Sequence, residues 1–142
     1  MSSPKGPGVV RRFRNHGLSV ADGTLVTVRL TTTSTNWHKG IDLDASHSTI
    51  EENTMVRNRR IADRACGGLE IAGDNNLVRR NETLGNGLAT GPFFVLNDFG
   101  MALVTGTGNR VEENSAGGNV RNGIKILAAA TGKVFCRNMV LG

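Results

Sequence analysis

With 142 residues, 38% of them hydrophobic but only 4% aromatic, the chain is long enough for one domain whose core is built from aliphatic side chains. Its 19 glycines and three prolines indicate many tight corners rather than a flexible linker. The formal net charge of +5 favours a polyanionic partner. From the sequence we expect neither a secretory signal peptide near Met1 nor a segment that spans a membrane, and the compartment stays open.

Residues 1–8 are expected to form a mobile tail, and residues 9–142 a single structured domain. The first part of this domain, from Gly17 to Thr33, begins with a glycine-led strand and contains a second strand-like run at residues 24–30. The polar TTTSTN stretch that follows is interpreted as a strand edge or a turn.

Two sequence markers then recur along the chain. One is a glycine followed by an apolar, a variable and an apolar residue, found five times at intervals of 23 to 32 residues. The other is a short run that ends in asparagine, found four times at intervals of 24 to 33 residues. Because both markers keep nearly the same register, they indicate an internal repeat. The glycines are Gly17, Gly40, Gly68, Gly100 and Gly123, and the asparagines are Asn53, Asn81, Asn114 and Asn138.

Each repeat is too short to bury its own apolar residues, but stacked repeats share a continuous core. The alternation Leu18/Val20 and Ile41/Leu43 marks inward positions of strands. The pattern therefore predicts an all-β fold, a single-stranded right-handed parallel β-helix (a solenoid) of about five coils. The asparagines are interpreted as a corner ladder of amide hydrogen bonds rather than as ligands.

The segments GIDLDASHSTIEEN, GLEIAGDNNLVRRN, GMALVTGTGNRVEEN and GIKILAAATGKVFCRN carry a family resemblance. Over roughly residues 9–142 the chain resembles the parallel β-helix repeats of the pectate-lyase-like superfamily. That group contains polysaccharide lyases, glycoside hydrolases, epimerases and many repeat proteins of unassigned activity. The resemblance implies that the glycine-led sheet lines a groove, but it implies no particular reaction. The chain departs from the enzymes by having no tyrosine, a single tryptophan and few acids for a calcium cage.

Charged pairs precede the asparagine marker and change sign from one repeat to the next. They are Glu51-Glu52, Arg79-Arg80 and Glu112-Glu113, followed by Arg137. Opposite charges on neighbouring strands stabilise by a few tenths of a kcal/mol per pair. The alternative, a catalytic carboxylate pair, is disfavoured because adjacent strand residues are expected to point to opposite sides.

The outward positions of the glycine-led strands supply the candidate catalytic residues. Asp42 and Glu70 are predicted to lie one coil apart, with Asp44 two positions beyond Asp42 on the same side. Two such acids could act as general acid and base in glycosidic cleavage, or could hold a weakly bound Ca²⁺. A solvated acidic patch is the third interpretation, and no other cofactor is expected.

Two longer connections supply candidate ligand-binding residues. The first is basic, and the second contains three of the five phenylalanines. Basic groups beside exposed rings suit an acidic sugar or a single nucleic-acid strand, whereas phenylalanines that fold back would form a satellite core or an oligomer contact. The candidates, with two lysines of the glycine-led strands, are Lys39, Arg59, Arg60, Arg64, Phe93, Phe94 and Lys125.

The remaining reactive residues give weaker signals. His16, His38 and His47 have no metal-ligand spacing, so no metal site is predicted. His16 and His38 both precede a glycine-led strand and are expected to approach each other. Cys66 and Cys136 are interpreted as unpaired thiols, and Gly106-Thr107-Gly108 as a solenoid corner.

These observations leave three functional hypotheses. The favoured one is a module that binds an anionic polysaccharide. The alternatives are a polysaccharide lyase or glycoside hydrolase acting on uronate-type polymers, and an assembly scaffold with no small-molecule site. Nucleic acid is disfavoured as a partner because acids offset the basic residues along the faces, and no membrane partner is expected. Bare terminal coils predict a homo-oligomer.

Overall fold

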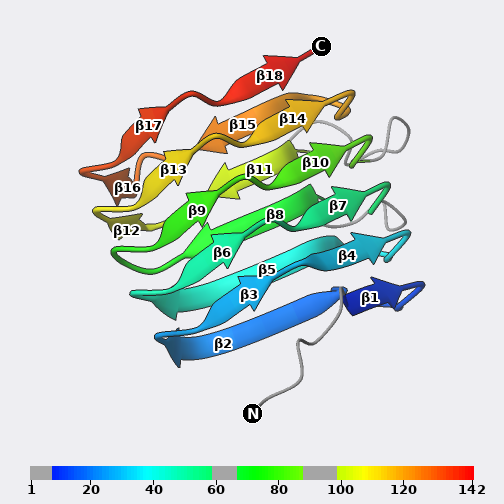
Figure 1. Ribbon diagram of the computed structural model, residues 1–142, viewed down its shortest axis with the longest axis horizontal. Helices are drawn as coiled ribbons and strands as arrows, with labels where there is room; N and C mark the ends of the chain where they lie inside the picture. Colours follow the sequence, from blue (N-terminus) through cyan, green and yellow to red (C-terminus); the bar gives the residue numbers. More distant parts are fainter. Residues whose placement is uncertain (1–7, 59–66, 88–98) are drawn as a thin grey trace.

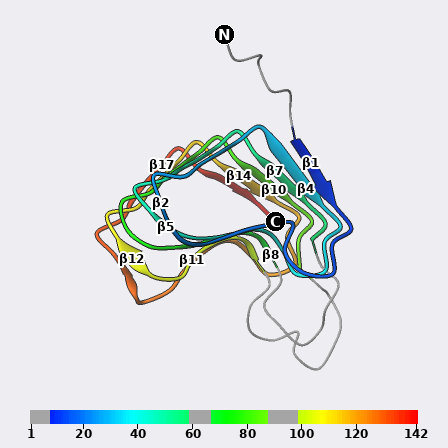
Figure 2. The same ribbon diagram turned by 90° about the horizontal axis from the view of Figure 1, so that it is seen from below.

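In the computed structural model, residues 8–58, 67–87 and 99–142 are described, and they form stacked parallel β-coils, about five turns in all (Figure 1). This confirms the predicted all-β solenoid. The view along the coils shows three flat sides with corners between them (Figure 2). Within the described ranges, no helix is long and apolar enough to cross a membrane. The predicted tail lies outside these ranges except for Gly8, which begins the first strand.

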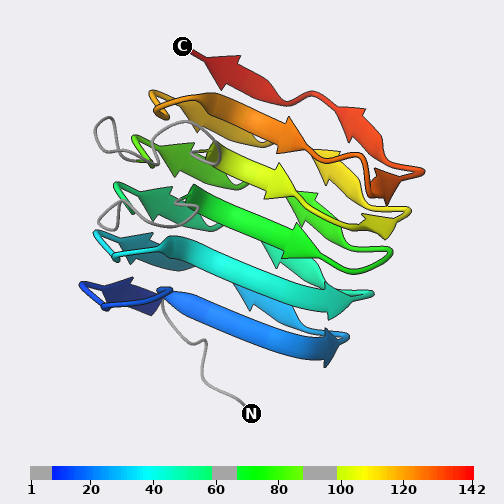
Figure 3. The same cartoon turned by 180° about the vertical axis from the view of Figure 1, so that it is seen from behind.

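Each side of the solenoid is one parallel sheet whose strands come from successive coils (Figures 1 and 3). Sheet A contains β1 (Gly8–Arg11), β4 (Thr31–Ser34), β7 (Thr54–Val56), β10 (Glu82–Leu84), β14 (Ser115–Gly117) and β18 (Met139–Leu141). Sheet B contains β2 (Leu18–Thr24), β5 (Lys39–Ser46), β8 (Gly67–Ala72), β11 (Phe99–Leu103) and β15 (Asn122–Ile126). Sheet C contains β3 (Thr27–Arg29), β6 (Thr49–Glu51), β9 (Leu77–Arg79), β13 (Arg110–Glu112) and β17 (Val134–Cys136). A fourth, two-stranded sheet joins β12 (Gly106–Thr107) to β16 (Ala130–Thr131).

The predicted register of the glycine-led strands is confirmed on sheet B. Ile41 pairs with Leu69 and Leu69 with Met101, and all three side chains are fully buried. Sheet C contributes Ile50, Val78 and Val111 to the same interior, one above another. Each such side chain stabilises the fold by roughly 1.5–3 kcal/mol through removal from water. The core is therefore a set of aliphatic stacks parallel to the solenoid axis.

The recurrent glycine of sheet B is required by a close approach of the backbone. A Cβ at Gly40 would lie 2.7 Å from the carbonyl oxygen of Gly68 and 2.8 Å from Nδ2 of Asn58. Gly68 meets the carbonyl of Gly100 in the same way, at 2.5 Å. A side chain at these positions would push neighbouring coils apart, so the sequence marker reflects packing between coils.

Asparagine ladders joined by side-chain amide hydrogen bonds hold two corners, and only one of them was predicted. The expected ladder follows sheet C, where Nδ2 of Asn53 donates to Oδ1 of Asn81 at 3.0 Å and Asn81 donates to Asn114 at 3.0 Å. A second ladder lies at the corner between sheets A and B. Its members are Asn36, Asn58, Asn86 and Asn119, with Nδ2–Oδ1 distances of 2.9 to 3.1 Å.

Three local expectations for the irregular segments need correction or refinement. The run at residues 24–30 is split, because Leu25 adopts a left-handed φ of 56° between β2 and β3. In the TTTSTN stretch, Thr31–Ser34 form β4, which pairs with β1 on one side and β7 on the other and is therefore not an edge strand, whereas Thr35 lies at the corner with a left-handed φ of 53°. The predicted corner at Gly106-Thr107-Gly108 contains β12, and both of its glycines have positive φ.

Candidate functional site

Asp42 and Glu70 lie beside each other on the outer side of sheet B, as predicted. They are register partners on β5 and β8, one coil apart. The Nζ atom of Lys39 lies 3.0 Å from Oδ1 of Asp42 and 2.8 Å from Oε1 of Glu70. Only 10% of the Lys39 side chain is exposed, so this ammonium group is held between the two carboxylates. Lys39, which was predicted as a ligand-binding residue, thus forms ion pairs with Asp42 and Glu70.

The two histidines that precede the glycine-led strands meet at the same place. The rings of His16 and His38 pack edge to face with centroids 4.6 Å apart, which confirms the expected approach. Nε2 of His16 lies 3.4 Å from Oδ2 of Asp42. Asp42 is therefore placed between an imidazole and an ammonium group, and we call His16, His38, Lys39, Asp42 and Glu70 the sheet B cluster.

The sheet B cluster is better suited to holding its own charges than to general acid–base chemistry. An acid–base pair needs two carboxyl groups that can reach the scissile bond. Lys39 holds both acids in ion pairs with its ammonium group. Its ammonium group also occupies the place between the carboxylates that a Ca²⁺ would take. No group of three or more His, Cys, Asp or Glu residues that could hold a metal ion occurs in the parts of the chain that the structure describes.

Two further candidates stand apart from the cluster. Asp44 is exposed and is the register partner of Ala72 rather than of an acid. Lys125 lies on β15 beside Ala102, and so is two coils, roughly 10 Å, from Glu70. Neither residue adds a group to the pair of acids.

The charged pairs of sheet C form the predicted ladder of ion pairs. Glu51 contacts Arg79 at 2.7 Å and Arg80 at 3.3 Å, and Glu113 contacts Arg137 at 3.0 Å. The expectation that adjacent residues point to opposite sides is wrong here. β6 ends at Glu51, and Glu52 follows at a left-handed φ of 56°, so both acids reach arginines on the outer surface. The acids are therefore ion-pair partners, as predicted, but the reason is that both contact arginines and not that they point to opposite sides.

Hydrogen bonds from arginine perturb two carboxyls of this ladder. The Arg29 guanidinium, 3.0 Å from Glu52, holds the pKa of that carboxyl below its ordinary value of 4.5. Arg110 does the same to the pKa of Glu112 through a contact of 2.6 Å. These acids are therefore committed to ion pairs rather than poised to exchange protons.

Sequence reasoning missed a concentration of positive charge at the corner between sheets A and B. Three arginines lie at the end of β1 and just after it, at positions 11, 12 and 14, and Arg57 occupies the corner position equivalent to Arg12 two coils further on. Phe13 is 55% exposed in this segment, and the guanidinium carbon of Arg14 lies 5.5 Å from the ring centroid of Trp37. We call this group the basic corner; it consists of Arg11, Arg12, Phe13, Arg14, Trp37 and Arg57.

The basic corner differs from sheet C in the partners of its arginines. Within residues 8–58, 67–87 and 99–142, no carboxylate forms an ion pair with Arg11, Arg12, Arg14 or Arg57. On sheet C, by contrast, every arginine contacts at least one glutamate. Among the described residues, the carboxylates that pair with arginine are Glu51, Glu52, Glu112 and Glu113, all on strands of sheet C or directly after them. A visible signal was the RRFR sequence at residues 11–14.

The predicted ligand-binding residues Arg59, Arg60, Arg64, Phe93 and Phe94 lie outside the described residues, as does Cys66. Cys136 is free, in agreement with its interpretation as an unpaired thiol. Its Sγ atom lies 3.6 Å from Oε2 of Glu112 at the end of the ladder on sheet C.

Comparison with known proteins returns one family. A family model described as a right-handed β-helix region matches residues 9–140. No curated protein and no solved structure matches the chain. The comparisons thus agree with the β-helix architecture of the chain and name no ligand.

Proposed function

The chain belongs to the right-handed β-helix family, and on this basis we propose that it binds an anionic polysaccharide at the basic corner. The observation that carries the proposal is the contrast between Arg11, Arg12 and Arg57, which have no carboxylate partner among the described residues, and the ion-paired arginines of sheet C. Guanidinium groups bind carboxylates and sulfates through paired hydrogen bonds. An array of such groups at one corner suits a polymer that carries repeated negative charge.

The arrangement of rings favours a sugar polymer over a nucleic-acid strand. Sequence-tolerant binding of single strands depends on several aromatic platforms for successive bases. In the basic corner Phe13 is the exposed ring, while Trp37 is half-buried beside Arg14. One exposed ring is enough for the apolar face of a single sugar. The resemblance to proteins that act on polysaccharides points the same way.

Binding of sodium alginate and polygalacturonate, followed by isothermal titration at several salt concentrations, tests this function. We expect binding that weakens as salt is raised, because the contacts are ionic. Arg12→Ala and Arg57→Ala should each weaken it by about tenfold, the value of one charge-assisted hydrogen bond. Arg137→Ala is the matched control, since Arg137 is an exposed corner arginine that contacts Glu113.

Several results would contradict the proposal. Among them are no binding of either polymer, an equal loss in Arg137→Ala, and tighter binding of a single-stranded oligonucleotide than of the uronate polymers. Binding of neutral dextran with the same affinity would also remove the role of the arginines.

A second candidate function, cleavage of such a polymer, is favoured by one observation, the contact of His16 with Asp42 inside the sheet B cluster. An imidazole beside a carboxylate can relay a proton. The same polymers, assayed for unsaturated products and for reducing ends, test it. Turnover that is lost in Asp42→Asn would establish the enzyme, and binding without turnover would leave the binding module.

A further inference from the structure

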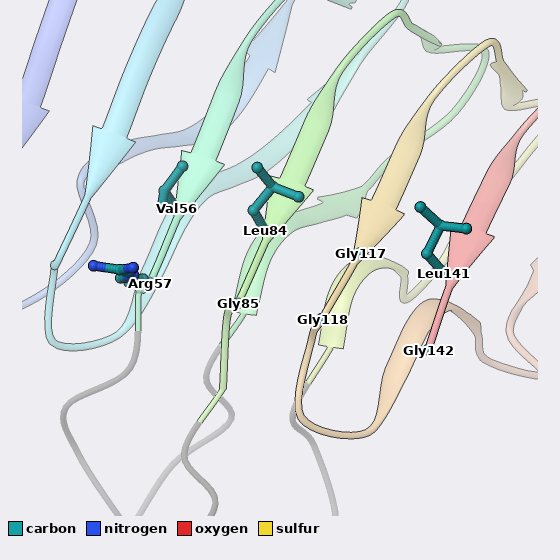
Figure 4. A pocket seen from close by; sticks show the side chains of 8 residues that line it. All are labelled: Val56, Arg57, Leu84, Gly85, Gly117, Gly118, Leu141 and Gly142. Atoms are coloured by element: carbon teal, nitrogen blue, oxygen red, sulfur yellow. The ribbon is translucent and has the colours of Figure 1, made fainter.

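An open apolar groove adjoins the basic corner on the outer side of sheet A (Figure 4). Its volume is about 500 Å³, and side chains from three strands form its walls. Val56 and Leu84 are register partners, Leu84 is the partner of Gly117, and Gly117 is the partner of Leu141. The groove therefore crosses three coil spacings, roughly 14 Å along the solenoid axis. Its lining residues are Val56, Arg57, Leu84, Gly85, Gly117, Gly118, Leu141 and Gly142.

Gly117 is the position that opens this groove. It interrupts an outward column in which the two adjacent coils carry Leu84 and Leu141 and the coil before Leu84 carries Val56. The backbone does not require glycine there, because Gly117 is not among the residues with positive φ. A Cβ would also fit, at 3.4 Å from Cδ2 of Leu84 and 3.8 Å from Cβ of Leu141. The absence of a side chain thus leaves a notch between two leucines.

The corner beside the groove is open for a similar reason. Arg12, Thr35, Arg57, Gly85 and Gly118 occupy equivalent left-handed positions in successive coils. Because Arg12, Thr35 and Arg57 carry side chains in this conformation, a positive φ alone does not require glycine at positions 85 and 118. An added Cβ at Gly118 would meet nothing within 4 Å.

Arg57 joins the groove to the basic corner, since it lines the groove and is one of the arginines without a carboxylate partner among the described residues. A ligand that follows the corner along the axis would leave a basic stretch at Arg12 and Arg57 and enter an apolar one at Leu84. The walls of the groove offer no side-chain hydrogen-bond donor apart from Arg57. Hydroxyl-rich sugars gain little from such walls, whereas an ester substituent places a methyl group against them and has no hydroxyl to desolvate.

From this continuity, and resting on the proposed function, we infer that the preferred ligand is an O-acetylated anionic polysaccharide, with its carboxylates at Arg12 and Arg57 and an acetyl group in the notch at Gly117. The polymer then lies parallel to the solenoid axis along the edge of sheet A. This assigns the binding path to the corner and the groove rather than to the acids of sheet B.

One alginate preparation, used before and after chemical O-acetylation, provides a matched pair of ligands for titration at fixed salt. We expect the full chain to bind the acetylated form about fourfold more tightly for each methyl group buried. Gly117→Val should abolish this preference. Ser115→Val, an outward substitution two residues earlier on β14, should keep the preference. Leu84→Ser, which removes a wall without filling the notch, should reduce it.

The outcomes separate this inference from the function on which it rests. Equal affinity for the two polymers, or a preference that survives Gly117→Val, would overturn the inference and leave polysaccharide binding intact. Failure to bind either polymer would overturn both.

Discussion

The ammonium group of Lys39 lies 2.8 Å from the carboxylate of Glu70, which projects from the next coil of the solenoid. The same Nζ atom is 3.0 Å from Asp42 on its own strand. Parallel stacking places these two like charges one rung apart, and a buried cation between them offsets their repulsion. This contact explains how a solenoid tolerates acids in adjacent coils on one face.

Replacement of Lys39 by methionine is expected to lower the free energy of unfolding by about 2–3 kcal/mol. Removal of one member of a buried ion pair costs about 3–5 kcal/mol, and partial exposure of the two acids reduces that cost. Urea unfolding followed by circular dichroism measures the change. The control is Asp44→Asn, a change at an exposed position of β5, with an expected change of less than about 0.5 kcal/mol. Equal losses in the two variants would show that Lys39 does not hold the acids together.

The ladder at Asn81 predicts a comparable loss. Its Nδ2 donates to the carbonyl of Ile50 at 2.8 Å, and its Oδ1 accepts the backbone N–H of Asn53 at 3.1 Å. Asn81→Ala leaves both buried backbone groups without these partners, at a cost of about 3 kcal/mol in unfolding free energy. Hydrogen exchange should show faster exchange at the amide of Asn53. The exposed Asn122→Ala provides the comparison, and an equal effect there would argue against the ladder as a source of stability.

The glycine and asparagine markers made the register of sheets B and C predictable because they follow from contacts between coils. Sheet A gave no such signal. Its inward column mixes Thr33, Met55, Thr83 and Ala116, so apolar alternation does not reveal its strands. Hydroxyl groups of Thr33 and Thr83 lie buried without a hydrogen-bond partner among the described residues, an arrangement that patterns of hydrophobicity do not anticipate.

The candidate site was predictable in part for the same reason. Asp42 and Glu70 follow directly from the register, whereas the bridging position of Lys39 depends on the conformation of its side chain. The basic corner was missed because two of its arginines, Arg12 and Arg57, occupy left-handed corner positions that are usually marked by glycine or asparagine. Which arginines lack acidic partners depends on side-chain contacts across coils, and spacing alone does not give these.

Packing of the glycine column predicts that Gly68→Ala disrupts the stack. The new Cβ would lie 2.5 Å from the carbonyl oxygen of Gly100, so β8 and β11 would have to separate. We expect a loss of about 2–3 kcal/mol, as in other overpacked interiors. Gly117→Ala has room for its methyl group and should change unfolding by less than about 1 kcal/mol. Thermal melts of the two variants measure the difference, and a stable Gly68→Ala would contradict the packing argument.

Acid should weaken the fold through the ladder on sheet C. Arg29 lowers the pKa of Glu52, and Arg110 lowers that of Glu112, each mainly through a side-chain hydrogen bond. The folded state therefore binds fewer protons than the unfolded chain near the ordinary glutamate pKa of 4.5. The stabilisation is fully present above that value and is lost as the pH falls through the lowered pKa. In urea unfolding at a series of pH values, Glu112→Gln should be less stable than the wild type near neutrality, and the difference should shrink on acidification.

Glu82→Gln, an exposed change on sheet A, controls for the loss of charge alone. A difference between Glu112→Gln and the wild type that stays constant down to pH 3 would show that the contact with Arg110 contributes nothing to stability.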